Sequence, residues 1–424
     1  MSLRKRKLPP TLGILVAMVL GIVIGHLVHA NVLEPQETAR IAGYISIASD
    51  VFLRLIKMLI APLVFSTLVV GIAHMGDASS VGRVFLKAMG WFLTASLISL
   101  LLGLVLANLL QPGASLNLPL PDAGQSAQLA TSKFTLKDFV NHLVPRSFVE
   151  AMANNEILQI VVFSVFFGTA AAAVGARATP MIDAIDGVAH VMLKLTGYVM
   201  NFAPIAVFAA VAGIIAKSGL GVLSTYGIFM AQFYFGIALL WIVLIGIGMA
   251  VIGPRILRLI SELRGPTVLA FSTASSEAAF PKTLEGLERF GVKNRLASFV
   301  LPIGYSFNLD GSMMYCTFAA VFIAQAYGIE LSMSTQITMM LVLMLTSKGM
   351  AGVPRASLVV IAATLNQFDI PEAGLLLLLA IDHFLDMARS ATNVIGNGIA
   401  TAVVAKWEGE LGEPNAEPAI SPLR

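Results

Sequence analysis

Long apolar runs alternate with short polar stretches along most of the chain, and many runs reach the roughly 20 residues that a membrane-spanning helix needs. Eight segments are therefore predicted to be membrane helices: residues 11–30, 41–74, 88–110, 139–174, 185–216, 226–253, 297–326 and 375–407. The fourth is broken into offset pieces at Pro145 and residues 154–156, and the second carries Arg54 and Lys57 near its start. Residues 111–137, rich in Pro, Gly and Ser, predict an exposed loop. The pattern indicates an all-α protein that crosses a membrane many times.

Polar residues interrupt the second half of this pattern in a repeating way. Residues 253–293 have basic ends and a small, polar middle, and they are too few to cross and return as two full helices. They predict a re-entrant hairpin from the cytoplasmic side, and residues 334–365, interrupted at 346–354, predict a second one from the outer side. The segment between them is broken at residues 304–312. Two similar units that enter from opposite faces form an inverted repeat, and paired interrupted segments point to the midplane site of a transporter.

The last apolar segment carries a row of polar side chains. At 3.6 residues per turn, a 4-3-4-4 spacing places five of them on one face of a helix: Asp382, Asp386, Arg389, Asn393 and Asn397. A charge at the bilayer centre costs about 3 kcal/mol or more, so this face must meet protein, water or a ligand rather than lipid. A structural Asp–Arg pair that joins neighbouring helices is the alternative. Two carboxylates and two amides beside one arginine exceed what such a pair needs, so the row is a candidate binding site.

Composition agrees with a membrane protein and argues against several other classes. The 424 residues are 57% hydrophobic and 12% charged, and this charged fraction is about half that of soluble domains. The single Cys316 excludes a disulfide framework, and six scattered histidines without a His-x-x-x-His pair give metal chemistry little support. The net charge of +3 does not indicate a nucleic-acid partner, because the basic residues cluster at segment ends.

The positions of the basic residues predict the orientation of the chain in the membrane. Residues 4–7 are all basic and precede a long apolar run without a small-residue cleavage site, so we expect a retained first helix with a cytoplasmic start. Other basic residues fall on the same side: Arg83, Lys87, Arg177, Lys406 and the cluster between residues 255 and 293. Both termini are therefore expected in the cytoplasm.

The interruptions offer groups that bind small ions. Backbone carbonyls at the break in the seventh segment, with Asn308 and Asp310, can ligate a hard cation through oxygen. Helix starts at Ser275, Ser276 and residues 349–352 can offer free N–H groups and a positive dipole end to a carboxylate.

The charged residues of the last segment complete this chemistry. Arg389 can clamp a second carboxylate with two hydrogen bonds, and Asp386 can bind an ammonium, so the expected ligand is a small dicarboxylate with an amino group. Simpler interpretations remain for each piece. Ser and Gly runs also serve helix packing, residues 308–311 can be a helix end, and Glu277 either holds a proton or caps the second arm of the hairpin.

Several motifs closely resemble those of the dicarboxylate/amino acid:cation symporter family, also called the glutamate transporter family. They are residues 58–65 (MLIAPLVF), 275–281 (SSEAAFP), 308–312 (NLDGS), 351–354 (AGVP) and 386–389 (DMAR) leading to Asn393. The similarity extends over essentially the whole chain in order and spacing. The resemblance is therefore highly specific.

The resemblance implies eight membrane helices plus two re-entrant helical hairpins, assembled as a homotrimer in a bacterial inner membrane. It implies a transport part that slides across the membrane like an elevator against a scaffold, with hairpin 334–365 as its gate. In residue numbers, a single transporter unit of 1–424 would hold a scaffold at about 8–76 and 139–217, a transport part at about 84–112 and 222–410, and a cytoplasmic tail at 411–424.

The resemblance also implies roles for individual residues. Arg389 would bind the side-chain carboxylate of the substrate, and Asp386 would bind its amino group. The other implied substrate contacts are Asn393, Ser312, Ser275, Ser276, Ser390 and the backbone at Gly352 and Val353. The implied sodium ligands are Gly304, Ser306, Asn308, Asp310, Asn393, Asn397, Ser347 and Met350.

The chain departs from the family pattern at several positions. Sodium-coupled members commonly carry Asp where this chain has Asn397, and animal members carry a proton-binding Glu where it has Cys316. Milder departures are Leu309 where Met is usual, Arg355 where Gly is frequent, and Ala95, flanked by Thr94 and Ser96, where a hydroxyl is expected. The sequence does not decide between sodium and proton as the coupling ion. The candidate proton carriers are Glu277, Asp310, Asp382 and Asp386.

We therefore predict a symporter, not an enzyme, that takes up glutamate or aspartate with H⁺, Na⁺ or both and needs no organic cofactor. A symporter for C4-dicarboxylates such as succinate is the alternative, which Asp386 disfavours because succinate has no amine to bind. An ion channel is more remote, because a channel usually shows a repeated ring motif or a continuous polar stripe along its pore. An intramembrane hydrolase is remote too, because Ser276 has no His or Lys base at suitable depth on its hairpin.

Overall fold

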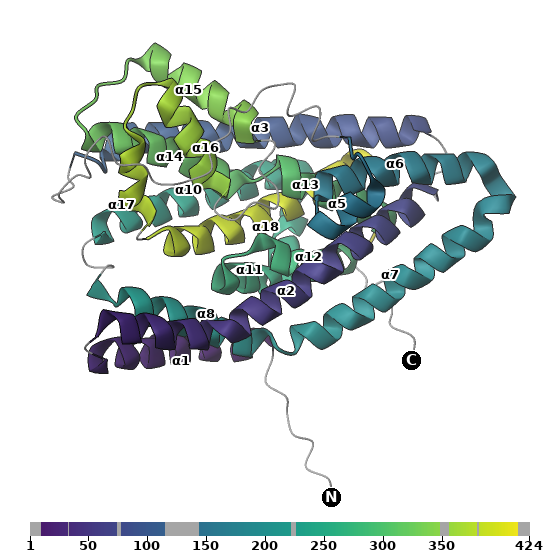
Figure 1. The fold of residues 1–424 in the computed structure, drawn as a ribbon. Helices are drawn as coiled ribbons and strands as arrows, with labels where there is room; N and C mark the ends of the chain where they lie inside the picture. The colour runs from purple at the N-terminus through teal and green to yellow at the C-terminus, as the bar shows by residue number, and fades with distance from the viewer. Residues whose placement is uncertain are drawn as a thin grey trace, which may run out of the picture.

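The computed structural model describes residues 10–32, 34–73, 78–114, 144–221, 226–347, 356–379 and 381–413. Within these ranges the protein is helical, and the single strand-like pairing is an isolated antiparallel bridge between Val292 and Leu411. Figure 1 shows long helices that form one elongated assembly. Six helical stretches in the described ranges are long and apolar enough to cross a membrane. The all-α, polytopic prediction is confirmed.

A first group of helices comes from the amino-terminal half of the chain. Its members are α1 (Pro10–Asn31), α2 (Pro35–Ala73), α5 (Phe148–Asn154), α6 (Ile157–Val174), η1 (Gly175–Ala178), α7 (Thr179–Met200) and α8 (Ala203–Ser218). Helices α1 and α2 lie along α8, and α2 also packs against α6 and α7 (Figure 1). Apolar side chains such as Val19 and Leu20 stay exposed on α1, as expected of a surface that meets lipid or another chain.

The remaining helices form a second group. Its members are α3 (Ala78–Leu110), α10 (Gly227–Ile252), η2 (Gly253–Arg255), α11 (Ile256–Thr273), α12 (Ser276–Phe290), α13 (Asn294–Phe307), α14 (Asp310–Ala326), α15 (Met333–Thr346), α16 (Ala356–Gln367), η4 (Glu372–Gly374), α17 (Leu375–Leu379) and α18 (Asp382–Trp407). Helix α18 contacts α3 and α10 to α14, and every residue from 387 to 405 is buried. Most of α18 therefore lies inside this group (Figure 1).

Most predicted interruptions fall where the sequence places them. Helices α11 and α12 pack against each other and are joined at Ala274 and Ser275, as expected of the first hairpin. The seventh segment breaks at Asn308 and Leu309, and the fourth divides into α5 and α6. Helices α15 and α16 are neighbours, as expected of the second hairpin, but residues 348–355 between them lie outside the described residues.

Three expectations about single segments were wrong in detail. The fifth segment is two helices, α7 and α8, because Pro204 at the start of α8 has no N–H to continue the hydrogen-bond ladder. The eighth is also divided, since α18 begins only after Ile381. Helix α2 begins at Pro35, so Arg54 and Lys57 lie near its middle and not near its start.

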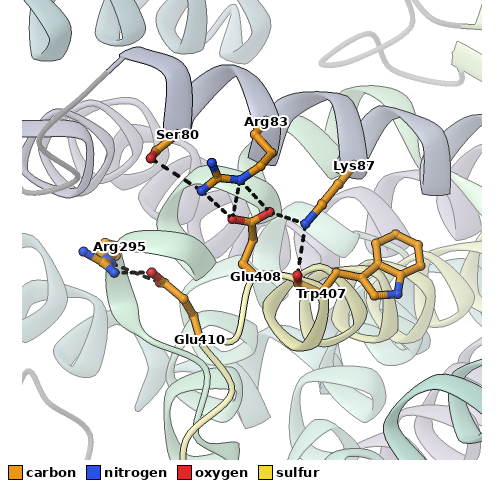
Figure 2. A network of polar contacts seen from close by, with 7 residues as sticks. All are labelled: Ser80, Arg83, Lys87, Arg295, Trp407, Glu408 and Glu410. Carbon is orange, nitrogen blue, oxygen red and sulfur yellow. Dashed lines mark hydrogen bonds and ion pairs between the residues drawn. The ribbon is translucent and has the colours of Figure 1, made fainter.

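The residues that follow α18 join several elements at one end of the second group. Glu408 accepts a hydrogen bond from Arg83 Nε at 3.1 Å and an ion-pair contact from Lys87 Nζ at 2.6 Å, both from α3 (Figure 2). Glu410 pairs with Arg295 near the start of α13 (Figure 2). We call this set of ion pairs around residues 408–413 the carboxyl-terminal clasp.

Backbone contacts extend the clasp to the first hairpin. The Gly412 N–H donates to the Gly291 carbonyl at 2.9 Å. Gly291 adopts φ of +110°, and a β-carbon there would lie 2.6 Å from the Gly412 carbonyl oxygen, so glycine is required on both counts. The clasp thereby ties α3, α12, α13 and α18 together.

Candidate functional site

Arg389 is the centre of the buried polar row on α18. Its side chain is 2% exposed, and its Nη2 lies 3.0 Å from Asp382 Oδ1 and 3.1 Å from Asp386 Oδ1. Asp382 occupies the first turn of α18 with a 6% exposed side chain, whereas the Asp386 side chain is 38% exposed. One buried guanidinium thus faces two carboxylates, and the carboxylate of Asp386 stays accessible.

Most of the hydrogen-bonding capacity of Arg389 is unused within the part of the chain that the structure describes. Its Nε and Nη1 have no hydrogen-bond partner there, although both are buried. The guanidinium carbon lies 4.1 Å from the centre of the Tyr315 ring, whose face stabilises the cation and holds its plane in place. Buried donors without partners are costly, so this geometry favours an anion as the missing partner.

The three charged residues do not join neighbouring helices. Asp382, Asp386 and Arg389 all belong to α18, and the ion pairs among them cross no helix boundary. This geometry argues against the structural alternative, in which an Asp–Arg pair holds two helices together. The charges are better explained as groups that face a common ligand.

Asn393 connects this row to the break in the seventh segment. Its Oδ1 accepts from the Gly311 N–H at 3.0 Å, and its Nδ2 lies 3.4 Å from Ser312 Oγ. A β-carbon at Gly311 would lie 2.6 Å from the Arg389 carbonyl oxygen, so only glycine permits this approach. The positive end of the α14 dipole therefore lies beside Arg389, which also favours an anionic ligand.

A second cluster of polar atoms lies at the same break. Asn308 and Asp310 are fully buried, and Asn308 Nδ2 donates to Asp310 Oδ2 at 3.0 Å. Three side-chain oxygens here have no hydrogen-bond partner among the described residues: Ser306 Oγ, Asn308 Oδ1 and Asn397 Oδ1. Oxygens at an unwound helix break are the ligands that Na⁺ prefers in transporters, so this donor set fits a small cation.

Helix α3 adds two hydroxyls to the cation cluster. Ser99 Oγ lies 3.4 Å from Asp310 Oδ1 while it donates to the Ala95 carbonyl at 2.8 Å, and Ser96 Oγ donates to the Phe307 carbonyl at 3.3 Å. A hydroxyl was expected at or beside Ala95, and Ser96 supplies it. Thr94 does not, because it is exposed and donates to the Gly90 carbonyl of its own helix. Sequence reasoning missed Ser99, although its three-residue spacing from Ser96 in an apolar helix was a usable signal.

The tip of the first hairpin presents a helix start. Ser275 caps α12, and its Oγ accepts from the Ala278 N–H at 3.2 Å. Ser276, the first residue of α12, is half-buried. Helix α12 packs against α18, so this tip lies on the side of the polar row. The hydroxyl of Ser275 already accepts a hydrogen bond from the helix start. The expected substrate contact therefore depends on Ser276 and on the N–H groups of the first turn of α12.

The expected contacts from the second hairpin are only partly described. Ser347 is buried, and its Oγ donates to the Met344 carbonyl at 3.0 Å. Met350, Gly352 and Val353 lie outside the described residues, and their roles stay predictions. Ser390, next to Arg389 on α18, is buried.

The candidate proton carriers occupy three different places. Asp382 lies with Asp386 at Arg389, and Asp310 belongs to the cation cluster. Glu277 instead lines a pocket toward α2, away from the α18 row. The structure therefore does not bring Glu277 together with the other candidates.

Aromatic residues that the sequence did not single out shape the site. Tyr315 belongs to the α14 face that begins at Gly311 and Ser312, so its spacing was a signal. Trp241 Nε1 donates to Thr392 Oγ1 at 2.8 Å and Tyr234 donates to the Phe384 carbonyl at 2.7 Å, which fixes α18 against α10. These two contacts join distant segments and had no signal in the sequence.

Comparison with known proteins agrees with this geometry. A sequence model of the sodium:dicarboxylate symporter family matches residues 11–407. A proton/sodium-glutamate symport protein of Bacillus caldotenax is 38% identical over 99% of both chains. The proton/glutamate-aspartate symporter of Escherichia coli (strain K12) is 40% identical over 95% of this chain and 94% of its own length. A C4-dicarboxylate transport protein of Rhodospirillum rubrum is 40% identical over 94% of this chain and 88% of its own.

Proposed function

Because the chain belongs to the sodium:dicarboxylate symporter family, we propose that it takes up glutamate or aspartate by symport with Na⁺, H⁺ or both. Relatives that are named glutamate or glutamate-aspartate symporters support this substrate class. The reaction is transport without covalent change of the substrate, in a multi-pass protein of the bacterial inner membrane. No organic cofactor takes part.

One observation supports the substrate most directly. Arg389 has two unpartnered donors beside the accessible carboxylate of Asp386, within the described chain. The side-chain carboxylate of the substrate binds the free Nε and Nη1, and its ammonium binds Asp386. The α-carboxylate meets Asn393, Ser312 and the helix starts of the hairpin tips.

The cation cluster supports the coupling function. Ser306, Asn308 and Asn397 supply oxygens that have no hydrogen-bond partner among the described residues, and Asp310 supplies a negative charge. A bound Na⁺ would neutralise that charge and hold the α13–α14 break in the shape that binds the substrate. Substrate and cation then stabilise the same arrangement, which is the thermodynamic basis of coupling.

The division into two packing groups supports an elevator mechanism. Helices α1, α2, α7 and α8 pack mainly among themselves, while α3 and α10 to α18 surround the site. We propose that the first group is the scaffold of a homotrimer, that the second group slides against it, and that the hairpin at α15 and α16 is the gate.

A C4-dicarboxylate symporter is the second candidate, and relatives that are 39–40% identical carry this name. The two candidates differ at Asp386. For glutamate, its carboxylate has a partner in the ammonium. For succinate, it has none and stays as a charge beside the bound ligand.

Uptake by purified protein in proteoliposomes tests the proposal. We expect accumulation of labelled glutamate or aspartate against its gradient when Na⁺, H⁺ or both are imposed as gradients. Substitution Asp386→Ser should reduce glutamate uptake about 10- to 100-fold, the worth of one charge-assisted contact, while inhibition by succinate persists.

Two outcomes would contradict the proposal. Passive equilibration of substrate without accumulation would indicate a channel. Equal loss of glutamate and succinate recognition in Asp386→Ser would count against the ammonium-binding role of Asp386.

A further inference from the structure

A small pocket lies outside the α18 site, where the first group of helices meets the first hairpin. Ile60 and Val64 of α2 and Ile157 of α6 form its wall on the side of the first group. The pocket has room for about one water-sized sphere. This wall is apolar, so an ionised group that faces it is poorly solvated.

The opposite wall carries one acidic residue. Glu277 and Phe280 of α12 and Tyr305 of α13 face the pocket from the second group. Among the described residues, the Glu277 carboxylate has no hydrogen bond and no ion pair. Ser275 caps α12 instead, which argues against a capping role for Glu277.

Few charged groups act on Glu277 from the elements packed around it. Lys57, near the middle of α2, is the cation whose charge acts on the carboxylate. Helix α13 presents Tyr305, and α6 presents the apolar Ile157. Helices α11 and α18, which also pack against α12, contribute no lining residue to the pocket.

We propose that Glu277 carries the coupling proton of this symporter, at a site separate from the cation cluster. The inference rests on the proposed symport, because it is the sliding of α12 and α13 past α2 that gives Glu277 its role. Burial disfavours the ionised carboxylate here, and the charge of Lys57 opposes that effect. Away from Lys57 it would face apolar side chains, which favour the neutral acid during the movement that carries the substrate.

The proton balance is simple. A proton from water on the outer side binds one carboxylate oxygen of Glu277 and forms a neutral carboxylic acid. After the second group has moved, that O–H bond breaks and the proton passes to water on the cytoplasmic side. No other bond changes, and the empty second group returns with Glu277 ionised, so one proton moves inward for each substrate.

Uptake driven by an imposed proton gradient tests the assignment. In full-length Glu277→Gln, we expect proton-driven accumulation to fall at least tenfold, and exchange of internal for external substrate to become independent of pH. Glu330→Gln, which changes an exposed glutamate between α14 and α15, is the matched control and should behave like wild type.

A second variant keeps the test decisive if Glu277→Gln does not fold. Lys57→Met removes the positive charge that acts on Glu277, so the Glu277 proton becomes harder to release. The pH of half-maximal uptake should then shift upward, and Glu277→Asp should retain proton-driven uptake. A purely structural Glu277 would shift no pH profile.

The outcomes separate this inference from the proposed function. Wild type that accumulates succinate but not glutamate contradicts the substrate proposal, and the Glu277 test is then made with succinate. Wild type whose uptake needs Na⁺ and ignores the proton gradient overturns the Glu277 assignment and leaves the substrate proposal intact. Undiminished proton-driven uptake by Glu277→Gln overturns it as well.

Discussion

Two sets of ion pairs in this protein use the same chemistry in opposite ways. On α18, one arginine that is 2% exposed faces two carboxylates and leaves two donors unused within the described chain. At the carboxyl-terminal clasp, Arg83 is 54% exposed, and Glu408 is held by both Arg83 and Lys87 (Figure 2). The first set is buried and incompletely paired within the described chain, whereas the second is well paired, and its cations reach the surface although the Glu408 side chain is only 6% exposed.

The difference indicates what each set does. Ion pairs that water can reach contribute about 1 kcal/mol or less, so the clasp adds modest stability and fixes the end of α18 against α3 and α13. A buried guanidinium with free donors costs stability unless a ligand completes it. The clasp is therefore structural, whereas the α18 set is suited to binding.

Removal of Arg389 should have the largest effect. In Arg389→Ala, uptake of acidic substrates should fall about 100-fold or more, because the substrate carboxylate loses its bidentate partner. The free energy of unfolding should also fall by about 3–5 kcal/mol, since Asp382 stays buried without its cation. Uptake in proteoliposomes and thermal unfolding in detergent measure the two effects.

The matched control is Arg83→Ala in the clasp. It should keep substrate affinity and change stability by about 1 kcal/mol or less. Equal losses of uptake in the two variants would remove the distinction between a binding set and a structural set.

A carboxylate at position 397 tests whether Na⁺ binds at the cation cluster. In Asn397→Asp, the Na⁺ concentration for half-maximal uptake should fall about tenfold, because a second negative charge joins Asp310 at the buried oxygens. Without Na⁺ the same variant should be less stable, since two buried carboxylates repel each other. Na⁺ titrations of uptake and of thermal stability measure both, and an unchanged Na⁺ dependence would place the cation elsewhere.

The clasp should show the smallest effect and a defined pH dependence. Burial would raise the pKa of the Glu408 carboxyl, but hydrogen bonds from Lys87 and Arg83 outweigh it and lower that pKa. The contribution of Glu408 is therefore present above its ordinary pKa of 4.5 and is lost as pH falls through the lower folded value. Glu408→Gln should cost about 1 kcal/mol or less near neutral pH.

In acid, the difference in unfolding temperature between wild type and Glu408→Gln should disappear, because the wild-type carboxyl is then protonated. Thermal unfolding at neutral pH and at a series of pH values that descends from 4.5 checks this. A difference that grows in acid would mean that Glu408 stabilises the fold through something other than its charge.

Much of the fold was predictable because the bilayer imposes strong rules on a sequence. Apolar length predicted most helices, and small or polar interruptions predicted the breaks at Asn308 and at Ala274. Helix ends were less predictable. The break at Ile381 comes at the end of an apolar run without a Pro or Gly to mark it, and the start of α2 at Pro35 precedes its apolar run.

The candidate site was predictable where its residues share one helix. Asp382, Asp386 and Arg389 lie on one face by spacing alone, and the structure places all three within one ion-paired set. The cation cluster was predictable from Asn308 and Asp310 but not from Ser99, which reaches Asp310 across a helix contact.

The sequence by itself determined the class of protein, the order of its helices and the charged face of α18. These depend on hydrophobicity and on periodicity within a helix, which are local properties of the chain. Only the tertiary structure decided that the Tyr315 ring covers Arg389, that Asn393 holds Gly311, and that Glu277 faces α2. Those contacts join segments distant in sequence, and their partners are selected by how whole helices pack rather than by the spacing of residues along any one of them.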